Sequence, residues 1–185
     1  MREESSEPVH GSRQINERTF VMAETATLSR FEVIFDAEGV NRSKFRNDVK
    51  VHLRGPYAVS YELPTDEGGI HGGDGSAPYP LAYFTSALTA CVMTQIRAFS
   101  KRLDIPVDGF SVITRCHWQA QQRGNAPYES APVAFTMDVD IESDASEADK
   151  RRLLAAAQKG CFVEQSLKPG LVRHRLKVGE RWVEA

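Results

Sequence analysis

The sequence predicts an α+β fold, and three observations support this. Segments with a two-residue hydrophobic period fill the region before residue 64, a long apolar segment of helical period follows, and the remainder gives strands, a helix and a last strand. The chain has 185 residues, of which 41% are hydrophobic and 26% charged. This length and composition are ordinary for one globular domain with a buried core, which we expect over residues 25–185.

Three strands are predicted before residue 64. In the first, hydrophobic side chains alternate with their neighbours, and the Glu38-Gly39 pair is expected to end the strand; the alternating positions are Phe31, Val33 and Phe35. Two further alternating runs, 49–53 and 57–63, are separated by Gly55-Pro56. They therefore predict a β-hairpin.

A helix is predicted over 81–103, behind a loop over 64–78 that holds five glycines and two prolines. Pro80 stands in the first helical turn, where proline is favoured. The apolar residues recur at spacings of three and four: Leu81, Phe84, Leu88, Cys91, Val92, Ile96 and Phe99. Alanines between them leave little polar surface, so we expect this helix to be buried on nearly all sides, with Cys91 about three turns inside.

The remaining elements are two strands, a helix and a strand. The periodicity predicts strands over 110–118 and 133–141, a helix over 146–161 and a last strand over 171–178, with Ser146 as the N-cap of the helix. Cys116 alternates with apolar residues on one face of the first of these strands. A small hydrophobic side chain is sufficient there, so Cys116 is expected to be structural.

The charge pattern gives no sign of nucleic acid or a membrane as a partner. The formal net charge is −2, and no long run of one sign occurs. The longest apolar window, 81–96, contains threonine, serine and glutamine and is followed at once by Arg97, so it is too short and too polar to span a bilayer.

The N-terminal residues are polar and mixed in charge. Residues 1–24 contain no apolar run that could act as a signal peptide, so we expect a flexible tail, and either Met1 or Met22 could be the true start. Three cysteines are too few for a secreted disulfide scaffold and fit a reducing compartment better. The cytoplasm is therefore the predicted location.

Histidines and glycines give no metal or nucleotide motif. The five histidines show no zinc-type spacing among themselves or with the cysteines, so we expect no metal site. The glycine-rich loop lies between a strand and a helix, but no Lys-Ser/Thr pair follows it. We therefore exclude nucleotide binding and expect no bound cofactor.

Three motifs together resemble a known family. They are Gly-Gly-x-Gly-x-x-Pro-x-Pro at 72–80, Ser-Ala-Leu-Thr-Ala-Cys at 86–91 and Cys-Phe-Val-x-x-Ser-Leu at 161–167. They resemble the OsmC/Ohr superfamily of osmotically induced and organic-hydroperoxide-resistance proteins, over most of residues 31–178. The resemblance implies an intertwined homodimer in which β-sheets wrap around two long central helices.

The resemblance also implies a cysteine-based activity. Family members reduce organic hydroperoxides with a peroxidatic cysteine on the long helix and a resolving cysteine on the second helix, which here are Cys91 and Cys161. The Cys91 thiolate would become a sulfenic acid, Cys161 would condense with it, and a cellular dithiol would reduce the disulfide. The alternative for both residues is packing, because free cysteine is among the most buried residue types.

Two further family positions concern the activation of Cys91. The arginine that stabilises the thiolate in the family corresponds to Arg46, or to Arg42 if the alignment shifts, although an arginine in such a hairpin is more often a solvated charge. The glutamate that orients this arginine is replaced by Leu81. This departure leaves a second hypothesis: a protein of the same fold that binds a small apolar ligand without efficient peroxidase activity, with the cysteines as passive wall residues.

Overall fold

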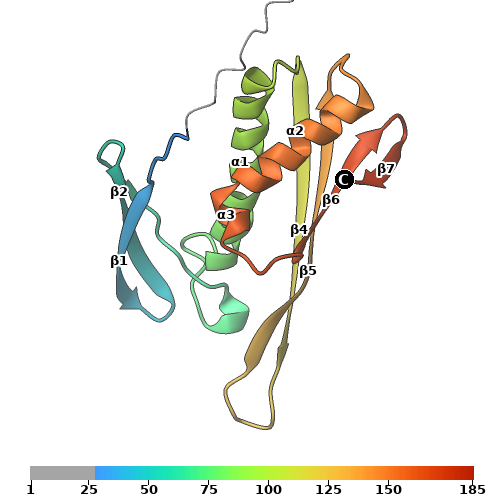
Figure 1. Cartoon of the computed structure of the whole chain (residues 1–185). Helices are drawn as coiled ribbons and strands as arrows, with labels where there is room; N and C mark the ends of the chain where they lie inside the picture. Colours follow the sequence, from blue (N-terminus) through green and yellow to red (C-terminus); the bar gives the residue numbers. More distant parts are fainter. Residues whose placement is uncertain (1–27) are drawn as a thin grey trace, which may run out of the picture.

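The computed structural model describes residues 28–185 and confirms the predicted α+β class (Figure 1). A three-stranded and a four-stranded sheet are joined by a long helix, α1 (Pro80–Arg102). The predicted tail over 1–24 and both candidate start methionines lie outside the described residues.

The N-terminal sheet contains β1 (Ile34–Ser43), β2 (Arg46–Gly55) and β3 (Val59–Glu62), all antiparallel. The predicted hairpin of β2 and β3 is confirmed. The predicted turn at Glu38-Gly39 is wrong, because both residues pair with β2 and the strand continues through them. The chain reverses instead at Lys44, whose positive φ of 44° suits a tight turn.

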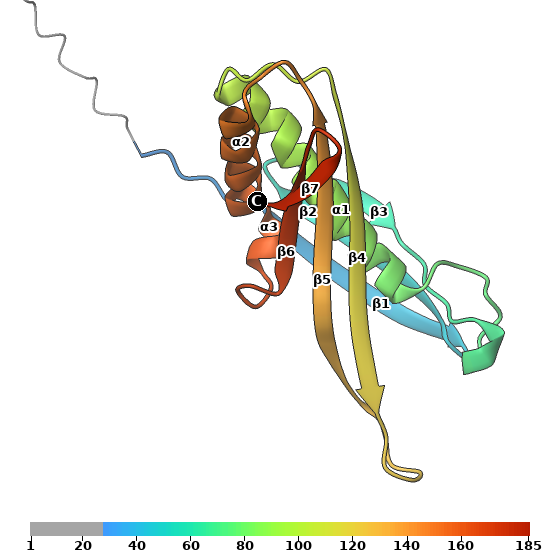
Figure 2. The same ribbon diagram turned by 90° about the vertical axis from the view of Figure 1, so that its right-hand side faces the viewer.

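The four-stranded sheet has the order β4 (Gly109–Gln121), β5 (Glu129–Glu142), β6 (Val172–Val178) and β7 (Arg181–Glu184). The β5–β6 pair is parallel and the other two pairs are antiparallel. Strand β7 has only four residues and was not predicted. Strands β4 and β5 continue well past their neighbours as a long two-stranded arm (Figures 1 and 2).

Two further helices lie between β5 and β6. In α2 (Glu147–Gly160), Ser146 is the N-cap as predicted, and its side chain accepts a hydrogen bond from the backbone N–H of Asp149. The helix ends one residue earlier than predicted. Cys161 has an extended backbone and separates α2 from the short helix α3 (Phe162–Gln165).

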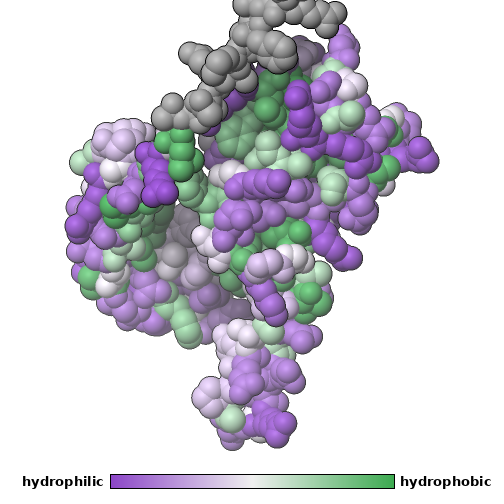
Figure 3. All heavy atoms as spheres, viewed as in Figure 1, coloured by the Kyte–Doolittle hydropathy of each residue, from purple (hydrophilic) through white to green (hydrophobic). Residues whose placement is uncertain are grey.

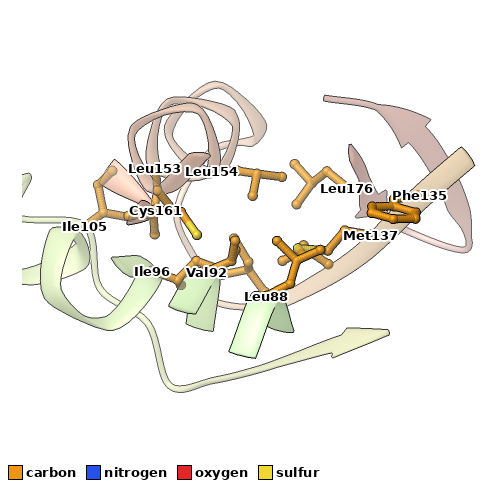
Figure 4. Packing of buried hydrophobic residues seen from close by; sticks show 13 residues of the cluster. Leu88, Val92, Ile96, Ile105, Phe135, Met137, Leu153, Leu154, Cys161 and Leu176 are labelled. Carbon is orange, nitrogen blue, oxygen red and sulfur yellow. The ribbon is translucent and has the colours of Figure 1, made fainter. Parts of the chain in front are cut away.

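The hydrophobic core lies between α1, α2 and one face of the four-stranded sheet (Figure 4). It consists of fully or almost fully buried side chains from all three parts: Leu88, Val92 and Ile96 of α1, Leu153, Leu154 and Ala157 of α2, and Phe135, Met137, Val139, Ile141 and Leu176 of the sheet, together with Ile105 and Cys161. The side chain of Cys161 points into this core beside Ile96 and Val92.

Only one face of α1 is buried within the chain. The opposite face leaves Leu81, Ala82, Ser86, Ala87 and Ala90 exposed, so the expectation of burial on nearly all sides is met on one side only. The N-terminal sheet makes no extensive packing contact with the helices or with the four-stranded sheet, and Figure 3 shows a hollow beside it. Among residues 28–185, none of the helices combines the length and hydropathy needed to cross a membrane.

Candidate active site

Two cysteines far apart in sequence meet at the centre of the molecule. Cys91 is half-buried on α1, and Cys161 is fully buried where α2 ends. The two thiols lie close enough for the Cys91 thiol to influence the titration of Cys161. Burial, and then the neighbouring Cys91 thiol, raises the pKa of the Cys161 thiol to about 12, so Cys161 is a neutral thiol at physiological pH.

Local geometry explains why Cys161 reaches α1. At Gly160, a Cβ atom would lie 2.5 Å from Cε2 of Phe99 on α1, a separation that real side chains do not allow. Glycine therefore permits the end of α2 to approach α1 closely. The extended backbone of Cys161 then turns its sulfur inward, where Sγ accepts a hydrogen bond from the backbone N–H of Glu164 at 3.4 Å.

A polar pair with little exposure involves Glu164, the residue whose backbone N–H bonds to the Cys161 sulfur. Oε1 of Glu164, on α3, is 2.9 Å from Nε2 of His174 on β6, and the two side chains are only 14% and 3% exposed. The negative charge of Glu164 also contributes to the raised pKa of Cys161. This pair was not predicted from the sequence, although Glu164 follows Cys161 by three residues. At that spacing, a helical turn brings a backbone N–H to a capping side chain.

Arg46, the predicted activating arginine, lies at the start of β2 and is anchored within its own chain. Its guanidinium donates to Oδ1 of Asp48 at 3.2 Å, and to the carbonyl and hydroxyl oxygens of Ser76 at 3.2 and 3.0 Å. Arg42, the alternative position, also donates to Asp48, at 2.7 Å. Within the described residues, neither arginine has a hydrogen bond or ion pair with Cys91.

Asp48 is the carboxylate that orients these arginines. The hydrogen bonds from Arg42 and then Arg46 hold the pKa of Asp48 below its usual value. Asp48 was not identified from the sequence, because the family glutamate was sought at the start of the helix. At that place, Leu81 is 53% exposed and has no group that could bond a guanidinium.

The glycine-rich loop that receives Arg46 is held rigidly. Oδ2 of Asp66 accepts hydrogen bonds from the backbone N–H and the hydroxyl of Ser76, and these bonds lower the pKa of Asp66. At Gly73, a Cβ atom would lie 1.9 Å from the carbonyl oxygen of Glu67, so no larger residue fits without backbone movement. The loop therefore fixes the position of Ser76 and, through it, that of the Arg46 guanidinium.

An apolar groove of about 830 Å³ runs along the exposed side of α1. Its lining combines the start of α1 with the glycine-rich loop: Glu67, His71, Tyr79, Leu81, Ala82, Thr85, Ser86, Thr89, Ala90 and Met93. The groove begins at Leu81 and passes beside the turn of α1 that carries Cys91. A small apolar molecule or an apolar protein surface suits such a lining.

Two further predictions concern Cys116, which was expected to be structural, and the histidines, for which no metal site was expected. Cys116 packs against the core from β4, and burial raises the pKa of its thiol. Across residues 28–185, no three His, Cys, Asp or Glu side chains are grouped closely enough to hold a metal ion.

The structure is an α+β fold in which a cysteine on a long helix and a cysteine at the end of a second helix lie close together. The family model described as OsmC-like protein matches residues 73–174, which is more than half of the chain. The chain therefore belongs to the OsmC-like family, as the sequence motifs predicted.

Several solved structures are similar to this chain. The chain is 41% identical to an OsmC-like hydroperoxide resistance protein from Jannaschia sp. CCS1, over 83% of this chain and 98% of that chain, with a TM-score of 0.48. An OsmC-like protein from Mycoplasma pneumoniae has 14% identity, coverage of 78% and 95%, and a TM-score of 0.57. An organic hydroperoxide resistance protein OsmC from Legionella pneumophila has 16% identity, coverage of 80% and 97%, and a TM-score of 0.52. At 14% and 16% identity, the likeness concerns the fold alone. The comparison with curated proteins gives no match.

Proposed function

We propose that the protein is a thiol-dependent peroxidase that reduces organic hydroperoxides with Cys91 and Cys161. The observation that carries this proposal is the proximity of the two thiols: half-buried Cys91 packs against the core that contains fully buried Cys161, and it raises the pKa of the Cys161 thiol. The half-buried thiol of Cys91 can meet a substrate, whereas the buried thiol of Cys161 can meet only Cys91. This asymmetry suits a peroxidatic and a resolving cysteine.

The proposed reaction balances without a metal or bound cofactor. The Cys91 thiolate attacks one oxygen of the peroxide, the O–O bond breaks, and the alkoxide leaves as an alcohol after taking a proton; Cys91 is then a sulfenic acid. The Cys161 sulfur attacks the Cys91 sulfur, the S–O bond breaks, and water leaves with formation of a disulfide. A cellular dithiol then reduces this disulfide, which fits a reducing cytoplasm.

A thiol count tests the proposal. We expect one equivalent of cumene hydroperoxide to consume two thiols per chain, with Cys116 remaining alkylatable and a Cys91–Cys161 disulfide found by peptide mass analysis. Dithiothreitol should restore both thiols. Loss of one thiol or none, with no disulfide, would contradict the proposal.

We further propose that Arg46 reaches Cys91 across a homodimer. The N-terminal sheet that carries Arg46 makes no extensive packing contact with the helices or the four-stranded sheet of its own chain, and one side of α1 is exposed. A second copy that covers α1 could bring its own Arg46 toward Cys91, where a guanidinium would stabilise the thiolate. Asp48 and Ser76 would hold this guanidinium in place.

Sedimentation velocity at low micromolar concentration checks the dimer. We expect a single dimeric species, because a monomer would leave α1 and a row of large apolar side chains of the N-terminal sheet in water: Ile34, Phe35, Val40 and Tyr61. A compact, folded monomer under these conditions would contradict the intertwined arrangement.

The groove beside α1 favours a second candidate function. Its apolar lining starts at Leu81, which replaces the family glutamate, and a small apolar ligand could bind there with the cysteines as passive wall residues. In that case, an apolar fluorescent probe such as 1-anilinonaphthalene-8-sulfonate would bind the folded protein, while cumene hydroperoxide would leave its thiols intact.

Restoring the glutamate separates the two functions. We expect Leu81→Glu to increase the second-order rate of Cys91 oxidation by cumene hydroperoxide about threefold to tenfold, because a carboxylate at the helix start would add a second carboxylate partner, besides Asp48, for the Arg46 guanidinium. Stopped-flow measurement of thiol loss gives this rate.

The matched control is the double variant with Arg46→Ala. The gain should disappear in this background, since the glutamate acts only through the arginine. An unchanged or lower rate in folded Leu81→Glu would favour the ligand-binding function, in which Leu81 is part of an apolar wall.

A further inference from the structure

The buried pair of Glu164 and His174 has no role in the chemistry described so far. It joins α3 to β6, and the backbone N–H of Glu164 bonds to the Cys161 sulfur. Buried polar groups are costly unless they are fully hydrogen-bonded. Within residues 28–185, however, Oε2 of Glu164 and Nδ1 of His174 have no hydrogen-bond partner. Each residue of the pair therefore has one buried polar atom whose hydrogen bonding is incomplete.

The hydrogen bonds indicate how the two groups are protonated. Nε2–H of His174 donates to Oε1 of Glu164, and a second proton on Nδ1 would be buried without an acceptor. The neutral imidazole beside a carboxylate satisfies this geometry best. It leaves Oε2 of Glu164 without a hydrogen-bond partner and able to accept a proton, on the residue whose backbone N–H bonds to the Cys161 sulfur.

Cys161 needs such an acceptor for the resolving step. Only a thiolate attacks a sulfenic acid efficiently, but burial keeps the pKa of Cys161 at about 12. The thiol therefore remains protonated until a base removes its proton. Glu164 is near in two ways: its backbone N–H bonds to the Cys161 sulfur, and its charge contributes to the raised pKa of that thiol.

We propose that Glu164 is the general base of the resolving step and that His174 is a positioning residue that holds its carboxylate beside Cys161. This inference rests on the proposed function, because it requires a sulfenic acid on Cys91. Glu164 accepts the thiol proton of Cys161 as the sulfur attacks Cys91. The S–S bond forms and the S–O bond breaks; the protonated Glu164 then gives its proton to the departing hydroxide, which leaves as water.

The titratable groups around Cys161 come from α1, α2, α3 and β6. They are Cys91 on α1, Cys161 at the end of α2, Glu164 on α3 and His174 on β6. Among the described residues, His174 is the only basic side chain that pairs with Glu164. A change in the pH profile of disulfide formation after mutation of Glu164 can therefore be assigned to this cluster.

The test separates the two half-reactions in the full-length protein. One equivalent of cumene hydroperoxide is mixed rapidly with the reduced protein, the sulfenic acid is trapped with dimedone, and the disulfide is quantified after an acid quench. Glu164→Gln removes the base but keeps the shape of the side chain and the backbone N–H. Glu180→Gln, which makes the same chemical change at an exposed position, is the control.

The expected result is an unchanged rate of Cys91 oxidation and slower disulfide formation in Glu164→Gln. Loss of a general base typically costs about 10²-fold or more, whereas loss of the nearby negative charge would recover about tenfold at most, so a net slowing of at least about tenfold is expected. Sulfenic acid should accumulate. Without the base, the rate should follow the thiolate fraction and rise about tenfold per pH unit, a steeper dependence than in the wild-type protein.

His174 provides a second, independent pair of variants. His174→Leu removes the donor that holds Glu164 and should slow disulfide formation and change its pH profile, whereas His174→Gln keeps a side-chain N–H donor and should restore much of the rate. If Glu164→Gln does not fold, the two His174 variants test the inference in its place. A purely structural role would change stability without changing the pH profile.

Two outcomes would overturn the inference, and they are distinguishable. If the wild-type protein forms the Cys91–Cys161 disulfide and the Glu164 and His174 variants form it at the same rate with the same pH profile, the proton-transfer role is wrong while the proposed function stands. If the wild-type protein forms no disulfide with one equivalent of peroxide, the proposed function and this inference both fail.

Discussion

We expect Cys91→Ser to abolish the consumption of organic hydroperoxide and Cys161→Ser to leave one stoichiometric oxidation that stops at the sulfenic acid. Cys91 is the half-buried thiol, so without it no accessible sulfur remains in the pair. Without Cys161, the sulfenic acid has no partner and proceeds to sulfinic acid with excess oxidant. The two variants should therefore differ in kind as well as in degree.

Dimedone labelling and intact mass measurement distinguish these cases. Cys161→Ser should trap one dimedone per chain after one equivalent of cumene hydroperoxide, and Cys91→Ser should trap none. Cys116→Ala is the control; it should keep the full rate and cost about 1 kcal/mol of packing. If neither variant traps dimedone and both lose turnover, the two cysteines do not act as this pair.

Hydrophobic periodicity was sufficient to predict most of the fold. The β2–β3 hairpin, α1, the strands β4, β5 and β6, and the Ser146 cap of α2 were all expected from local patterns. The wrong prediction concerns a position where strand pairing outweighs the local turn preference of the residues. Glu38-Gly39 has the composition of a turn, but antiparallel pairing with β2 over the full length of β1 keeps both residues extended.

The site could be predicted only in part. Cys91 and Cys161 were found because motifs identify them, whereas Glu164 and His174 meet only through the parallel pairing of β6 with β5, which places His174 opposite Met137 and under α3. Local sequence carries no signal for such a contact. Arg46 was identified by position, but its anchors Asp48 and Ser76 depend on the fold of the glycine-rich loop.

The packing that holds α1 against the sheet gives the largest expected effect on stability. Phe135 on β5 is 1% exposed, and its ring lies 4.9 Å from that of Trp118 on β4 and 5.8 Å from that of Phe84 on α1. These edge-to-face contacts join the helix that carries Cys91 to both long strands. Phe135→Ala would leave a cavity among groups that rigid elements hold in place, so we expect a loss of about 3–5 kcal/mol.

Urea unfolding followed by circular dichroism measures this loss, at one fixed protein concentration because a dimer's stability depends on concentration. Tyr128→Ala is the control: Tyr128 belongs to the same β4–β5 hairpin but is 68% exposed, so its removal should change the stability by less than about 0.5 kcal/mol. A loss below about 1 kcal/mol in Phe135→Ala would show that the core can collapse into the space. Because Phe84 lies about two turns before Cys91 on α1, such collapse would also shift the Cys91 sulfur relative to Cys161.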